Sequence, residues 1–214
     1  MASAGNGQQF AASRAIIGWM IAATGAEVMS QLIRLQQTEP PAWLFCDYAG
    51  RLAALALLAA NPAVRGVVYR AEPLKISLAI VINWGLLLIP ICGAAIVAGH
   101  VYAAYLPTFR LGTYPRPDGW LLIFDLTFGL ALVALHEEIV LRRAMRLALG
   151  GLGDGRAMTA VSSLLFGGYH WWTGVPNMIF AGVFGVFAML LFRRTGALWP
   201  VVVLHFMVDL ICFI

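Results

Sequence analysis

Side chains that can move a proton or hold a water molecule occur at three places within long apolar stretches of this 214-residue sequence. A carboxylate can act as a general base, and an imidazole can hold or polarise a water molecule. Glutamate, aspartate and histidine are also ligands of zinc. These residue types can therefore transfer protons or bind a metal ion. The three clusters are Glu137-Glu138 followed by Arg142, Phe166 followed by His170, and His205 followed by Asp209.

The spacing within each cluster is helical. Residues four apart share a face of an α-helix, so Glu138 and Arg142 can form a charge-assisted ion pair. The same spacing relates the two members of each of the other clusters. With a rise of about 1.5 Å per residue, the three clusters lie roughly 12–20 Å from one common end of their predicted helices. We therefore expect Glu137, His170 and His205 to face one shared pocket.

The composition indicates a membrane protein. Hydrophobic residues make up 61% of the chain and charged residues 11%, and the mean hydropathy is +0.84. Soluble domains are nearer 45–50% apolar and about 25% charged. These values exclude a soluble enzyme, a disordered chain and a nucleic-acid-binding protein. The predicted fold class is all-α, a polytopic transmembrane helical bundle embedded in the lipid bilayer.

Apolar runs near the ~20 residues needed to cross a bilayer predict about seven spans. Two of them are weakened by polar residues: Glu27 and Gln31 interrupt the first, and Asp47 and Arg51 interrupt the second. Either of these spans could lie partly in the membrane interface. The predicted spans are residues 14–35, 42–60, 75–106, 119–147, 157–172, 176–193 and 197–214.

The basic residues predict an orientation. With seven spans and a cytoplasmic N-terminus, nine basic residues fall inside and three outside, which follows the positive-inside rule. The net charge of +4 therefore reflects topology and not a nucleic-acid surface. We expect an integral protein of the cytoplasmic (inner) membrane of a prokaryote. The residues inside are Arg14, Arg65, Arg70, Lys75, Arg143, Arg146, Arg156, Arg193 and Arg194, and those outside are Arg34, Arg110 and Arg116.

Two familiar protease patterns are absent. His136-Glu137 begins like the zincin helix, but Val140 stands where the second histidine ligand is required. Ser162-Ser163 has no Gly-x-Ser setting of the rhomboid type.

The ordered motifs Glu-Glu-x-x-x-Arg, Phe-x-x-x-His and His-x-x-x-Asp resemble those of the CPBP family of intramembrane proteases. That family includes type II CAAX prenyl endopeptidases (Rce1-like proteins) and bacteriocin-processing and immunity-type membrane proteins. The motifs cover residues 137–209. The resemblance implies a peptidase core in the last four spans, at residues 111–214, preceded by N-terminal transmembrane helices at residues 1–110.

The resemblance also implies roles for the motif residues. Glu137 would be the general base that activates the hydrolytic water, and His170 would hold the same water. Glu138 would be held by Arg142, and Phe166 would support the site.

The third motif departs from the family pattern, which often ends in Asn where this chain has Asp209. The resemblance implies that His205 and residue 209 stabilise the oxyanion. An ionised Asp has no proton to donate, so Asp209 would act if protonated or by orienting His205. Glu137, His170, His205 and Asp209 would also make a plausible Zn²⁺ ligand set. We favour catalysis by glutamate without a cofactor, and zinc stays open.

The leading hypothesis is an intramembrane endopeptidase acting on a membrane-anchored protein or peptide. The scissile bond would lie in a lipid-anchored tail, a leader or a C-terminal anchoring signal. One alternative is a non-catalytic immunity or assembly partner that binds a peptide segment. Another is a proton-coupled transporter. The sequence shows no inverted repeats, which argues against this alternative.

Overall fold

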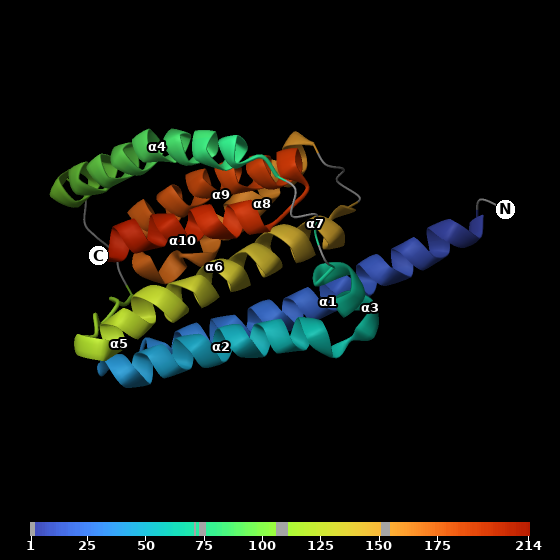
Figure 1. Cartoon of the computed structure of the whole chain (residues 1–214). Helices are drawn as coiled ribbons and strands as arrows, with labels where there is room; N and C mark the ends of the chain where they lie inside the picture. Colours follow the sequence, from blue (N-terminus) through green and yellow to red (C-terminus); the bar gives the residue numbers. More distant parts are fainter. Residues whose placement is uncertain (1–2, 71, 73–75, 106–110, 151–154) are drawn as a thin grey trace. The chain divides into compact units, whose positions relative to one another are not determined.

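The computed structural model describes residues 3–70, 72, 76–105, 111–150 and 155–214, and every regular element in these ranges is a helix (Figure 1). This confirms the predicted all-α class. Two of the residues that predicted the orientation, Lys75 and Arg110, lie outside the described residues, and the orientation stays a prediction. The helices form two compact units. Both units draw on both predicted regions, 1–110 and 111–214, and that predicted division remains a prediction.

The first unit contains a helical hairpin and one long helix. In the hairpin, α1 and α2 lie side by side (Figure 1). A Cβ atom on Gly50 would collide with the Ser30 side chain, so this glycine sets the close approach of α2 to α1. Asn61 Oδ1 accepts the backbone N–H groups of Ala63 and Val64 at 2.9 and 3.2 Å, which caps the next short helix. The elements are α1 (Ser3–Arg34), α2 (Pro40–Ala60) and α3 (Pro62–Val68), followed later in the chain by Gly119–Ala148.

The long helix Gly119–Ala148 contains two π-helical turns that the sequence did not predict. Each such turn inserts a residue into the α-helical repeat, and π-turns often occur at functional sites. Here they flank the segment that carries the glutamates. In chain order the helix consists of α5 (Gly119–Phe124), η1 (Asp125–Gly129), α6 (Leu130–Glu138), η2 (Ile139–Ala144) and α7 (Met145–Ala148).

The second unit is held together by close helix packing and by capped helix ends. Gly196, with a φ of +67°, closes α9 in the left-handed conformation that favours glycine. The Glu72 carboxylate accepts the backbone N–H groups of Leu198 and Trp199 at 2.7 and 3.4 Å, which fixes the start of the last helix. The helices are α4 (Leu78–Tyr105), most of α8 (Arg156–Tyr169), the short η4 (Trp171–Thr173), α9 (Val175–Thr195) and α10 (Trp199–Phe213).

Five stretches of the described chain are long and apolar enough to cross a membrane, so the protein is an integral membrane protein. They coincide with five of the predicted spans. The predicted spans 157–172 and 197–214 instead fall on α8 and α10, which have 14 and 15 residues and are shorter than the ~20 residues of a full span. The five stretches are Ala15–Arg34, Pro40–Ala60, Leu78–Tyr102, Gly119–Ala148 and Val175–Thr195.

Glycine brings α8 and α9 into backbone contact, and this generates a prediction. A Cβ atom on Gly167 would lie 2.7 Å from the Met178 carbonyl oxygen, a backbone atom that cannot swing away. We expect Gly167→Ala to destabilise the protein by about 1–3 kcal/mol, the usual cost of overpacking.

The matched control is Gly168→Ala, because a Cβ atom there meets no atom within 4 Å. Thermal unfolding in detergent micelles measures both variants. Equal melting temperatures for the two variants would contradict the close packing of α8 on α9.

Candidate functional site

The motif glutamates are buried in the first unit. Glu137 and Glu138 are the last two residues of α6, and their exposed fractions are 2% and 0%. A buried carboxylate must be paired or hydrogen-bonded, because desolvation of an isolated charge costs several kcal/mol. Although Glu137 and Glu138 end a helical segment, their carboxylates are therefore not exposed to solvent.

Glu138 is paired with Arg142, as the four-residue spacing predicts. Arg142 Nε lies 3.3 Å from Glu138 Oε2, and neither side chain is exposed. Arg142 Nη1 also donates a hydrogen bond to the Leu141 carbonyl oxygen at 3.2 Å. The ion pair connects the end of α6 to the π-turn η2 and compensates both charges inside the protein.

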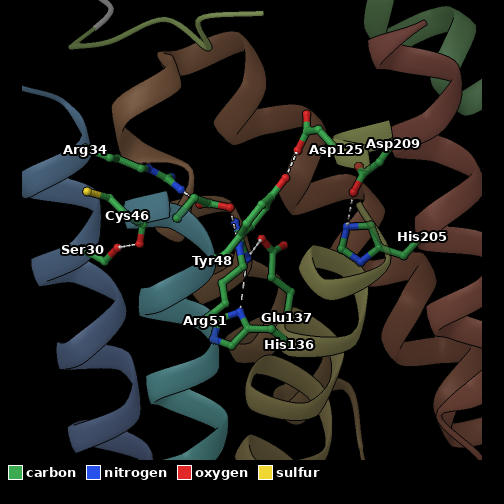
Figure 2. A network of polar contacts seen from close by, with 11 residues as sticks. Ser30, Arg34, Cys46, Tyr48, Arg51, Asp125, His136, Glu137, His205 and Asp209 are labelled. Atoms are coloured by element: carbon green, nitrogen blue, oxygen red, sulfur yellow. Dashed lines mark hydrogen bonds and ion pairs between the residues drawn. The ribbon is translucent and has the colours of Figure 1, made fainter. Parts of the chain in front are cut away.

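Glu137 is paired with Arg51, a residue of α2 (Figure 2). Arg51 Nη1 donates a hydrogen bond to Glu137 Oε1 at 2.9 Å, and the same nitrogen lies 3.2 Å from His136 Nδ1. Arg51 Nε donates to Asp47 Oδ2 at 3.0 Å. One signal of this role was present in the sequence, an aspartate and an arginine four residues apart within an apolar span, but no periodicity identified Glu137 as their partner.

The polar residues that interrupt the first two predicted spans face the interior of the first unit. Glu27 and Gln31 are fully buried, and Asp47 and Arg51 are 3% and 5% exposed. Asp125, in the π-turn η1, accepts a hydrogen bond from the Tyr48 hydroxyl at 2.5 Å. These side chains therefore build a polar interior in the first unit.

The second unit brings the motif histidines together around one aromatic ring. The ring centre of Phe166 lies 5.0 Å from that of His170 and 5.8 Å from that of His205. His205 is 4% exposed and also packs on Phe184, with ring centres 4.8 Å apart. Phe166 thus holds one imidazole just after α8 and another on α10, which gives the Phe-x-x-x-His motif a physical basis.

Hydrogen bonds and charge orient the two imidazoles. His170 Nδ1 lies 2.9 Å from the Phe166 carbonyl oxygen, and since a carbonyl can only accept, this nitrogen carries the proton. In the neutral ring, Nε2 is then the basic atom. His205 Nε2 lies 3.6 Å from Asp209 Oδ2, as the four-residue spacing predicts (Figure 2).

The predicted site residues are divided between the two units. Glu137, Glu138 and Arg142 belong to the first, and the residues of the other two motifs, Phe166, His170, His205 and Asp209, belong to the second. A shared pocket for all of them stays a prediction.

The zinc alternative likewise stays open. Among the described residues, no three His, Cys, Asp or Glu side chains are grouped so as to hold a metal ion. The zinc set considered above combines Glu137 from one unit with His170, His205 and Asp209 from the other.

Comparison with known families bears on the segment that carries the motifs. Residues 118–211 match the family model described as type II CAAX prenyl endopeptidase Rce1-like. The matched segment contains all three motifs, which confirms the resemblance read from them. No curated protein and no solved structure matches the chain.

The buried Glu138–Arg142 pair generates a stability prediction. Arg142→Met leaves the Glu138 carboxylate buried without its counter-charge, and we expect a loss of about 3–5 kcal/mol in the free energy of unfolding. The double variant Glu138→Met/Arg142→Met removes both charges, so it should recover most of this loss. Thermal unfolding in detergent micelles measures each variant.

Arg194→Met is the control, since Arg194 is exposed at the end of α9. Additive losses in the double variant would contradict the pairing.

Proposed function

We propose that this chain, whose residues 118–211 are Rce1-like, is an intramembrane endopeptidase that hydrolyses a peptide bond of a membrane-anchored protein or peptide. The observation that carries the proposal is the state of Glu137. It is a carboxylate within a membrane-spanning helix, 2% exposed and held by a guanidinium, and it lies in the matched segment with both motif histidines.

Glu137 acts as the general base in this proposal. The carboxylate takes a proton from a water molecule, and the water oxygen attacks the carbonyl carbon of the scissile peptide bond. His170 accepts a hydrogen bond from the same water at Nε2, because its Nδ1 proton is directed to the Phe166 carbonyl oxygen at 2.9 Å. Glu137 then returns the proton to the leaving amine as the carbon–nitrogen bond breaks.

His205 stabilises the oxyanion that forms when water attacks. An imidazole N–H aimed at a developing negative charge is most effective in a site from which water is excluded. An ionised Asp209 cannot donate to an oxyanion, and its oxygen lies 3.6 Å from His205 Nε2. In this proposal Asp209 therefore pairs with a protonated His205 at Nε2, which leaves the Nδ1–H for the oxyanion, and Asp209 does not bind the oxyanion itself.

The substrate is held by the membrane. Large apolar side chains remain exposed along the spanning helices, so a substrate with its own lipid or transmembrane anchor meets this protein within the bilayer. A prenylated tail is one such anchor, and a leader or a C-terminal anchoring segment is another.

The general-base role is tested with Glu137→Gln, which keeps the shape of the side chain and removes its basic oxygen. Loss of a general base costs about 10²–10⁴-fold in rate, and we expect kcat to fall by that factor. The full chain is reconstituted in liposomes with a quenched fluorescent peptide, carrying either a farnesylated CAAX end or a transmembrane anchor. Mass spectrometry locates the cleavage site, and ¹⁸O uptake from labelled water into the new carboxylate identifies hydrolysis.

Glu39→Gln is the matched control, because Glu39 is an exposed glutamate next to α2. Full activity of Glu137→Gln would refute the assigned base. If neither peptide is cleaved while Glu137→Gln retains the protein's role in cells, the non-catalytic partner hypothesis is favoured instead.

Catalysis without a metal is the form we propose. The Arg51 guanidinium on the Glu137 carboxylate repels a second cation at the same oxygens, which disfavours Glu137 as a zinc ligand. We expect cleavage to persist after dialysis against 1,10-phenanthroline, with substoichiometric metal by elemental analysis. Activity that is lost on dialysis and restored by Zn²⁺ alone would favour the zinc set of Glu137, His170, His205 and Asp209.

A further inference from the structure

Arg51 lies on α2, outside the segment that matches the Rce1-like family, yet it binds the glutamate of the first motif. Its guanidinium contacts Glu137 Oε1 at 2.9 Å, Asp47 Oδ2 at 3.0 Å and His136 Nδ1 at 3.2 Å. The side chain is 6% exposed. A guanidinium placed this way in the interior of a helical bundle is fixed by its partners on both sides.

The contacts of Arg51 continue through Asp47 to α1 (Figure 2). Asp47 forms ion pairs with both Arg51 and Arg34, the last residue of α1. The Arg34 guanidinium carbon lies 4.7 Å from the centre of the Trp43 ring, a cation–π contact. Arg34 and Asp47 are 1% and 3% exposed.

Charges of alternating sign therefore connect three helices. The order is Arg34 on α1, Asp47 and Arg51 on α2, and Glu137 on α6. Each charge in this row has an opposite charge beside it, so the row can remain ionised although it is buried. Arg51 is held at its Nε by Asp47 and presents Nη1 to Glu137.

We propose that Arg51 is a positioning residue for Glu137, held in place by Asp47 and Arg34; this rests on the function proposed above. Binding Oε1 at a fixed point sets the plane of the Glu137 carboxylate and the direction in which the group meets a water molecule. In this role the guanidinium acts through the Glu137 carboxylate and not on the substrate itself. Catalytic competence of the Rce1-like segment thereby depends on α1 and α2, which lie outside the match.

A positioning role and a structural role predict different kinetics. Positioning acts on the chemical step, so we expect Arg51→Met to lower kcat at least tenfold with KM within about twofold of the wild type, per folded molecule. Arg51→Lys keeps a cation without the planar fork that reaches Asp47 and Glu137 together, so it should restore kcat only in part. Asp47→Asn, which loosens Arg51 but leaves it present, should fall between wild type and Arg51→Met.

The assay is the liposome assay with the two anchored peptides, and the folded fraction is measured by gel filtration and thermal unfolding. Arg65→Met is the matched control, because Arg65 is an exposed arginine of α3. If Arg51→Met does not fold, Arg51→Lys and Asp47→Asn provide the test. A kcat per folded molecule equal to that of the wild type in these variants would overturn the proposal and leave Arg51 a structural role.

Failure of this inference is distinguishable from failure of the proposed function. An inactive Glu137→Gln with a fully active Arg51→Met retains the peptidase and overturns the role of Arg51. An active Glu137→Gln overturns the assigned base and, with it, the positioning role of Arg51. A wild-type protein that cleaves neither peptide overturns the proposed peptidase.

Discussion

Charge compensation inside an apolar bundle is the constraint on which this structure depends. Ions removed from water cost several kcal/mol each unless an opposite charge is placed beside them. Glu138 meets Arg142 within its own helix, whereas Glu137 meets Arg51 from another helix. The Glu138–Arg142 pair stabilises its own helix, and the Glu137–Arg51 pair connects α6 to α2. Each of these carboxylates can therefore stay ionised although it is buried.

Local periodicity explains which features could be predicted from the sequence. The pairing of Glu138 with Arg142 and of His205 with Asp209 follows from four-residue spacing, and both pairs form. The all-α class follows from composition and from the length of the apolar runs. These features depend on a few neighbouring residues and on the helical repeat, so they need no knowledge of the tertiary fold.

Features that depend on tertiary packing could not be predicted from the sequence. The partner of Glu137 lies 86 positions earlier, and no periodicity connects the two. The π-turns beside the glutamates lie within the predicted span 119–147, whose apolar sequence shows no break at either turn. The ends of the helices at the other motifs also depend on packing: α8 (Arg156–Tyr169) and α10 (Trp199–Phe213) are each shorter than the ~20 residues of a full span.

The order of elements along the chain has a consequence for biogenesis. Arg51 leaves the ribosome 86 residues ahead of Glu137, so α2 must enter the lipid before its long-range counter-ion has been made. Asp47, one turn earlier on the same helix, is already present and offsets the charge during this interval. The Asp47–Arg51 pair therefore lowers the cost of inserting α2 on its own. Glu137 binds Arg51 only after α6 has been synthesised.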